Sequence, residues 1–338
     1  MTQSWRSATA VRILLVGALV STAGVGAYSF SSQSEGSSKQ SQSRPSSDSK
    51  ASAASFTTAD SGSCLTWKDD QGKITNFEQA DCAGEHRFEV SSREDLRAYP
   101  ASEFGSEAPM PDLTRQAQLR EELCLNPTIQ YMKGTFDQMG KYSVASILPP
   151  QDAWSKGDRT LLCGVQATDD KGTLIPTSGR AAEQDQSRIF RPEECVLVDA
   201  ASATRVVDCA ADHQMEITAI VDLQPVFPEG TPSLEQQDTH LRQVCTQAAQ
   251  DYLGGDDPLY FCTLQPFWTT LPENSWAGGS RSVNCALVFG QDRKFATLAG
   301  GARTGFTING QPPASRPVRA PIVNPEALIG PHPEPARP

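Results

Sequence analysis

The sequence predicts an α+β fold built from two tandem homologous disulfide-stapled modules, each with a small, mostly antiparallel sheet and one main helix. Three observations predict it. Two blocks of residues recur along the chain at fixed spacing, nine cysteines occur without a CxxC pair, and helix-like and strand-like segments alternate within each copy.

The first repeated block surrounds a cysteine and keeps an acidic residue, a histidine and a glutamate at constant offsets from it. Its residues are Asp81, Cys82, His86 and Glu89 in the first copy and Asp208, Cys209, His213 and Glu216 in the second. The second block joins a tryptophan to another cysteine. Its residues are Trp154, Gly157, Arg159 and Cys163, then Trp276, Gly279, Arg281 and Cys285. Matching registers in both blocks indicate duplication of one module.

The order of these landmarks predicts the boundaries. Module 1 is expected at 64–180 and module 2 at 195–303, joined by a polar connector at 181–194 that contains Pro192.

Within each module the sequence predicts one strand at the opening cysteine, one after the motif histidine and one at the last cysteine. A helix rich in Gln, Glu, Leu and Arg is expected between them, at 113–132 and 234–253. Asp112 and Ser233 are suited to cap these two helices.

Zinc sites usually contain closely spaced cysteine pairs, and none of the nine cysteines forms a CxxC pair. The cysteines therefore indicate disulfides that form in an oxidising compartment. We expect two disulfides per module, one closing a local loop and one joining the helix to the last strand, although other pairings remain open. The expected pairs are Cys64 with Cys82, Cys124 with Cys163, Cys195 with Cys209, and Cys245 with Cys285. Cys262 has no counterpart in module 1.

The N-terminal region predicts a membrane protein. Residues 13–30 are apolar and follow two arginines, which favours a single-pass anchor with residues 1–12 in the cytoplasm and the bulk of the chain outside. Cleavage of residues 1–27 as a signal peptide, giving a secreted protein, is the alternative. The Ser-rich segment 31–63 is expected to be a disordered stalk, and the Pro-rich segment 304–338 a disordered tail.

The formal net charge of -11 argues against a nucleic-acid partner, because such binding depends on Lys and Arg.

His86 with Glu89, and His213 with Glu216, invite a metal or acid–base interpretation. Strand alternation would instead place each His and Glu on opposite faces of the sheet, and zinc usually needs three or four ligands. We therefore expect structural histidines beside the disulfides, with ligand contact and metal or catalytic roles as alternatives. The sequence predicts no catalytic residue, no metal site and no cofactor.

The tryptophans and arginines of the second block also have two interpretations. Trp154 and Trp276 could stack on a sugar or a peptide, or they could fill space beside the helix while Arg159 and Arg281 donate to loop carbonyls. The second interpretation is favoured because large aromatic side chains mostly belong to the core.

Together the two blocks resemble the septum formation domain of actinobacterial membrane proteins, over residues 64–303. Family members often have Pro just before the motif histidine, where Glu85 and Asp212 stand here, and Cys262 is an additional departure. The resemblance implies a single-pass or lipid-anchored envelope protein and offers no catalytic residue to transfer.

Three functions follow as hypotheses. The first is a non-catalytic envelope protein that takes part in septum formation or cell division through contacts with other division or envelope proteins. The second is a module that binds a cell-wall ligand or a peptide through the Trp/Gly/Arg blocks. The third is a metal-dependent hydrolase.

Overall fold

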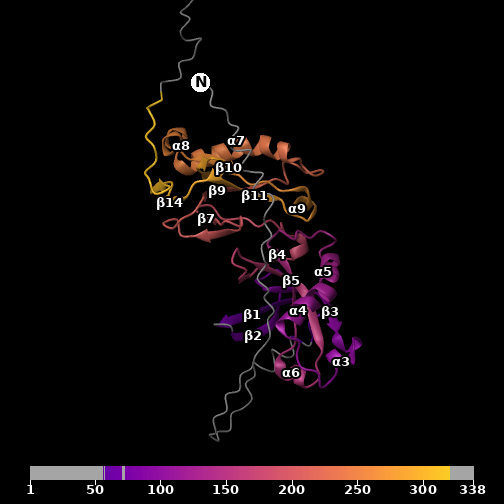
Figure 1. Ribbon diagram of the computed structural model, residues 1–338. Helices are drawn as coiled ribbons and strands as arrows, with labels where there is room; N and C mark the ends of the chain where they lie inside the picture. Colours follow the sequence, from indigo (N-terminus) through magenta and orange to yellow (C-terminus); the bar gives the residue numbers. More distant parts are fainter. Residues whose placement is uncertain (1–55, 57, 71–72, 320–338) are drawn as a thin grey trace, which may run out of the picture.

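The computed structural model describes residues 56, 58–70 and 73–319 as two sheet-containing modules that follow one another along the long axis of the molecule (Figure 1). The expected anchor at 13–30 lies outside these residues, as do most of the expected stalk and the end of the tail. Within the described part of the chain, no helix is both long and apolar enough to cross a bilayer.

Module 1 contains a six-stranded antiparallel sheet with the order β2-β1-β3-β5-β4, and β6 pairs with β5. Its elements are β1 (Cys64–Asp70), β2 (Lys73–Ala80), β3 (Phe88–Asp95), η1 (Leu96–Ala98), α3 (Ala101–Phe104), α4 (Leu113–Leu119), η2 (Arg120–Cys124), α5 (Leu125–Tyr131), β4 (Tyr142–Ile147), α6 (Gln151–Ser155), β5 (Thr160–Thr168), β6 (Leu174–Ile175) and η3 (Ala181–Glu183).

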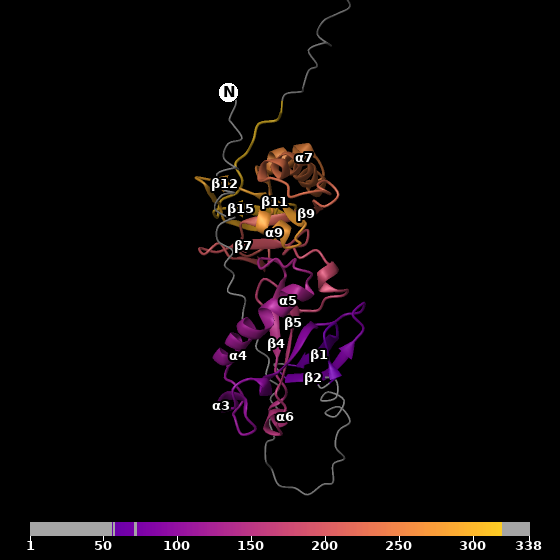
Figure 2. The ribbon, with the colours of Figure 1, turned by 90° about the vertical axis from the view of Figure 1, so that its right-hand side faces the viewer.

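Module 2 contains a five-stranded antiparallel sheet with the order β10-β11-β9-β7-β8 and two short hairpins. Its elements are β7 (Cys195–Val198), β8 (Thr204–Val207), β9 (Met215–Asp222), α7 (Leu234–Leu253), α8 (Asp256–Cys262), β10 (Gln265–Trp268), α9 (Glu273–Ala277), β11 (Ser282–Val288), β12 (Gly290–Gln291), β13 (Lys294–Phe295), β14 (Leu298–Gly301) and β15 (Gly305–Ile308). Figure 2 shows α7 above this sheet.

The two sheets match strand for strand, since β8-β7-β9-β11-β10 corresponds to β2-β1-β3-β5-β4. The register matches as well: Cys64 lies opposite Glu89, and Cys195 lies opposite Glu216. Both third strands carry a bulge at the same place, at Ser91 in β3 and at its counterpart in β9. The predicted fold class, α+β with two disulfide-stapled modules, is confirmed.

The main helices begin where the sequence indicates. The side chain of Asp112 accepts a hydrogen bond from the backbone of Arg115, and Ser233 forms a capping box with Gln236. α7 is continuous, whereas its counterpart in module 1 passes through the π-helical turn η2. Pro127 lacks the N–H that an α-helix would donate to the carbonyl four residues earlier, so the wider turn before it has a local cause.

Four disulfides join the strands and helices of the modules. They are Cys64–Cys82, Cys124–Cys163, Cys195–Cys209 and Cys245–Cys285, the same pairs that are expected from the sequence. Cys262 is free and half-buried.

The segments expected to be a disordered stalk and a disordered tail each contain ordered residues, and the expected connector is partly buried. Phe56 and Ala59, expected in a disordered stalk, are buried in the core of module 1 because they cover one face of its sheet. Within the expected connector, Gln186 and Ser187 are buried, and Gln186 is hydrogen-bonded to both modules through Asp137 and Gly279. The tail expected from residue 304 includes β15, which pairs with β14.

Candidate functional site

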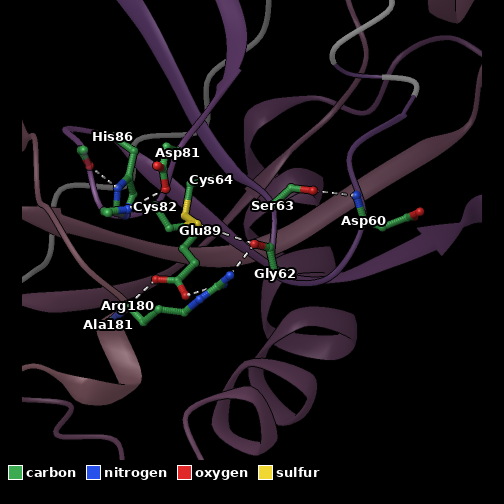
Figure 3. Close-up of a disulfide and its surroundings, with 12 residues drawn as sticks. Asp60, Gly62, Ser63, Cys64, Asp81, Cys82, His86, Glu89, Arg180 and Ala181 are labelled. Carbon is green, nitrogen blue, oxygen red and sulfur yellow. Dashed lines mark hydrogen bonds and ion pairs between the residues drawn. A yellow bond between two sulfur atoms is a disulfide. The ribbon is translucent and has the colours of Figure 1, made fainter.

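The first repeated block forms a group of side chains around a disulfide, which we term the first disulfide centre (Figure 3). It consists of Cys64, Asp81, Cys82, His86, Glu89, Tyr131 and Arg180. The sulfur of Cys64, a ring nitrogen of His86 and a carboxylate oxygen of Glu89 all lie within 4.8 Å of one another.

This convergence corrects the expectation that strand alternation would separate His86 from Glu89. β3 begins only at Phe88, so the alternation of the strand does not extend back to His86. His86 instead forms a bridge with Thr177, and its Nδ1 lies 3.0 Å from the carbonyl oxygen of Gly84. Because a carbonyl only accepts, Nδ1 carries a proton, and in the neutral ring Nε2 is an acceptor.

The side chain of Glu89 is 1% exposed, and both of its carboxylate oxygens accept hydrogen bonds. One carboxylate oxygen accepts from the backbone of Ala181 at 2.8 Å; the other accepts from the phenol of Tyr131 and from Arg180 at 3.4 Å. Burial, followed by the hydrogen bond to Glu89, raises the pKa of Tyr131 to about 12. The carboxylate thereby joins β3 to the helix and to the end of the module.

The side chain of Asp81 is hydrogen-bonded within its own turn and not to the other motif residues. Its side chain accepts a hydrogen bond from the backbone of Ala83 at 3.0 Å, and Asp208 does the same for Ala210 at 2.9 Å. Each aspartate therefore stabilises the turn that carries the second cysteine of its disulfide.

The second disulfide centre repeats this arrangement. It consists of Cys195, Asp208, Cys209, His213, Glu216 and Tyr252, and its Cys195, His213 and Glu216 again lie within 4.8 Å. Glu216 accepts from Tyr252 at 2.6 Å and from the backbone of Ala302 at 2.7 Å.

Two details distinguish the second centre from the first. Arg303 forms an ion pair with Glu193 and lies over the ring of Tyr252, 4.3 Å from its centroid, instead of bonding to Glu216. His213 is fully buried, and its Nε2 has no hydrogen-bond partner among the described residues.

Neither centre fits zinc in its oxidised form. The cysteine sulfurs are in disulfides, and a metal binds the thiolate. The remaining donors are one histidine nitrogen and a carboxylate that already accepts several hydrogen bonds, whereas a zinc site needs three or four protein ligands. The arrangement is suited to holding the opening strand, the motif turn and the module end together.

The second repeated block is also built into the core. Trp154 is 1% exposed, and the guanidinium of Arg159 stacks on its ring at 4.0 Å while donating to the carbonyls of Phe104 and Gly105. Gly157 has a φ of 93°, a conformation that favours glycine. These contacts agree with a structural role in module 1.

In module 2, Trp276 is 5% exposed and Arg281 lies 4.3 Å from its ring. Gly279 has a φ of 99°, and an added Cβ there would lie 2.8 Å from the side-chain nitrogen of Gln186. The second copy of the block therefore contributes to the contact between the modules.

The modules meet at a buried polar contact centred on Asp137. Its carboxylate accepts from Ser275 at 3.2 Å and from Ser280, and an added Cβ on Gly278 would lie 2.6 Å from the Cα of Asp137. Gln186 completes the contact by accepting from the backbone of Asp137.

A pocket of about 410 Å³ opens beside this contact. Its lining comes from β9, β10 and β11, from the segment that connects the modules, and from the loop that carries Asp137. No local sequence pattern predicts this pocket, because its lining comes from segments that are far apart in the chain. A usable signal was present: Phe77 of module 1 corresponds to the much smaller Thr204 of module 2.

The chain matches a protein-family model and two proteins of related sequence. A family model described as septum formation matches residues 61–285. Two uncharacterized membrane proteins, from the CDC 1551 / Oshkosh and ATCC 25618 / H37Rv strains of Mycobacterium tuberculosis, are each 35% identical to the chain over 272 residues. The alignments cover 78% of this chain but only 59% of each relative. No solved structure matches the chain.

Proposed function

Because the chain belongs to the septum formation family, we propose that it is a membrane-anchored envelope protein that acts without catalysis, through contacts with other division or envelope proteins. The naming of its relatives as membrane proteins supports the anchoring. We propose residues 13–30 as the anchor, with the modules on the extracytoplasmic side, where disulfides persist.

The observation that carries the non-catalytic role is the state of the two disulfide centres. They contain the residue types from which an active site could be built, yet their cysteines are oxidised. Glu89 and Glu216 each accept from a tyrosine and from a backbone amide. Side chains that are used in this way support the structure and are poorly placed to turn over a substrate.

Localisation in dividing cells tests the contact role. A fluorescent protein fused after residue 338 is expected to accumulate at the division site. A fusion that carries only residues 1–60 is the control, and it is expected to spread over the envelope because it lacks both modules. An even distribution of the full-length fusion would count against a septal role.

The absence of catalysis has its own test. Replacing His86 and His213 together by Asn keeps a side-chain donor for the neighbouring carbonyls of Gly84 and Ala211. The double variant is expected to complement a deletion strain fully, and the purified wild-type chain is expected to contain no stoichiometric metal. Loss of complementation by a folded variant, together with one bound metal per module, would instead favour the hydrolase hypothesis.

Binding of a wall ligand or a peptide is the second candidate function. The pocket beside Asp137 favours it. The Trp/Gly/Arg blocks favour it less, because Trp154 and Trp276 are buried. Co-sedimentation of the full-length chain with isolated cell wall tests the wall-ligand form, and a chain that stays in the supernatant would contradict it.

A further inference from the structure

The pocket lies on the face of the second sheet that turns away from α7. Alternate residues of β11 separate the two faces: Val283 and Cys285 belong to the core cluster beneath α7, whereas Asn284 and Ala286 line the pocket. Ile217 and Phe267 extend the pocket floor onto the neighbouring strands. The pocket is therefore a part of the sheet face that residues 56, 58–70 and 73–319 leave unfilled.

In module 1 the equivalent face is filled with aromatic rings. Trp67 in β1 and Phe77 in β2 are stacked with their ring centroids 5.8 Å apart, and Phe56 packs on Phe77 at 6.3 Å. All three side chains are at most 4% exposed. They close the face over Phe88 and Val90 of β3.

Their counterparts in module 2 follow from counting residues from the cysteines and strand ends that the two modules share, since β1 and β2 carry a register shift at Trp67 that β7 and β8 lack. Counting from the opening cysteine and from the β2 and β8 ends that pair with it, Trp67 corresponds to Val198 and Phe77 to Thr204. Counting back from Cys64 and Cys195 by the same number of residues, Phe56 corresponds to Ser187.

Each replacement is smaller, and Ser187 and Thr204 line the pocket. Phe190 and Phe295 restore only part of the missing apolar volume. What remains, about 410 Å³, falls within the roughly 300–1,000 Å³ of ligand pockets.

The chemistry of the lining indicates a neutral, largely apolar occupant. Both charged residues of the lining are already engaged: Asp137 accepts from two serines, and Arg188 donates to the backbone carbonyls of Thr168 and Asp169. The floor is apolar, and exposed Thr269 and Asn274 supply neutral polar groups.

We propose that this pocket binds an aromatic side chain of a partner protein, in the place that Phe56 and Phe77 occupy in module 1. Module 1 shows which group this sheet face accepts, since there a peptide segment of the chain itself supplies Phe56. The inference rests on the proposed function only in taking the occupant from a protein.

A titration observed by fluorine NMR tests the proposal. The probe is a capped Gly-X-Gly tripeptide, where X is 4-fluorophenylalanine, added to the full-length chain in phospholipid nanodiscs. Saturable binding to the wild type is expected. Thr204→Phe, which restores the ring of module 1, is expected to weaken binding at least tenfold, and the smaller Thr204→Leu about threefold.

Arg205→Phe is the matched control. Arg205 is the next residue of β8 and is exposed, so the same ring added there lies on the opposite face of the strand. This variant is expected to keep the wild-type affinity within a factor of two. Circular dichroism at the titration temperature confirms that each variant is folded.

Three results would overturn the proposal: no saturable binding to the wild type, equal affinity for Thr204→Phe and Arg205→Phe, or binding of decanoate in place of the tripeptide, which would indicate a lipid chain. An evenly distributed fluorescent fusion would refute the septal role without changing this titration, so the two failures can be told apart.

Discussion

Modules 1 and 2 share strand order, disulfides and the motif His–Glu pair, but they fill their sheets differently. Module 1 closes the face opposite its helix with Phe56, Trp67 and Phe77, whereas module 2 leaves a pocket there. The modules share the strand order and the disulfides, which determine the course of the backbone. They differ in the side chains on one sheet face, where the proposed partner would bind. A substitution in one module can therefore be compared with a substitution at the equivalent position of the other module.

The largest effect expected concerns the disulfides that join helix to sheet. Cys124–Cys163 and Cys245–Cys285 span 39 and 40 residues, so loop-closure entropy predicts the same contribution from each, about 4 kcal/mol. Replacing either pair by alanine should lower the unfolding free energy of its own module by that amount. Chemical denaturation, followed by hydrogen exchange in each module, measures both values.

The shorter disulfides are the control, since Cys64–Cys82 and Cys195–Cys209 span 18 and 14 residues and should each contribute about 3 kcal/mol. If the two long disulfides differed by more than about 2 kcal/mol, the modules would not be energetically equivalent despite their matching topology.

The arginines of the second block are expected to differ. Arg159 is 2% exposed and donates to several loop carbonyls, including those of Phe104, Gly105 and Trp154. Arg281 is less buried and donates to fewer carbonyls and to the side chain of Gln224.

Arg159→Met should therefore cost about 3 kcal/mol, because it leaves buried acceptors unpaired, and Arg281→Met about 1 kcal/mol, because water can replace the lost contacts. Thermal denaturation of the two variants compares them. Equal losses would mean that burial does not control the contribution of this residue.

The sequence predicted those parts of the structure that depend on local pattern or on the duplication. The caps at Asp112 and Ser233 follow from the preference of helix ends for such side chains. The matched order of the strands follows from the repeated blocks, because segments of like sequence adopt like structure.

The sequence could not predict features that depend on where an element begins or on contacts between modules. His86 lies beside Glu89 because β3 begins at Phe88, two residues after His86. The alternation of apolar and polar residues determines the ends of a strand poorly. The junction at Asp137 depends on Ser275 and Ser280, which are more than a hundred residues away. No local pattern reports such a pairing.

Alkaline pH should destabilise the two modules to different extents. Burial raises the pKa of Tyr131 and Tyr142 in module 1 to about 12, and it also raises the pKa of Tyr252 in module 2. A folded-state pKa above the unfolded value of about 10 means that the stabilisation is complete below pH 10 and is lost as pH rises towards 12. Module 1 contains two such tyrosines, so its free energy of unfolding should fall more than that of module 2.

Denaturation midpoints at pH 9 and pH 11.5 test this order, in a Cys262→Ser background that prevents thiolate exchange with the disulfides. Tyr131→Phe should reduce the pH dependence of module 1, and Tyr252→Phe should reduce that of module 2. A midpoint that falls equally for both modules would contradict the predicted order.

The smallest predicted effect concerns one hydroxyl in the strand bulge. The hydroxyl of Ser91 lies 2.8 Å from the hydroxyl of Thr128 in a buried pair. In module 2 the counterpart of Ser91 is Thr218, and the helix residue that corresponds to Thr128 is Ala249, which has no hydroxyl. The hydroxyl of Thr218 is buried and has no hydrogen-bond partner in the described part of the chain. Removing a paired and an unpaired hydroxyl should therefore have opposite effects.

Ser91→Ala should destabilise module 1 by about 1–2 kcal/mol, because it leaves Thr128 buried and unpaired. Thr218→Val keeps the shape of the side chain and should stabilise module 2 by about 1 kcal/mol. Adding Thr128→Ala to Ser91→Ala reproduces the residue of module 2 and should recover part of the loss. If Thr218→Val destabilises instead, the Thr218 hydroxyl has a bonded partner, and the two bulges are equivalent in energy as well as in register.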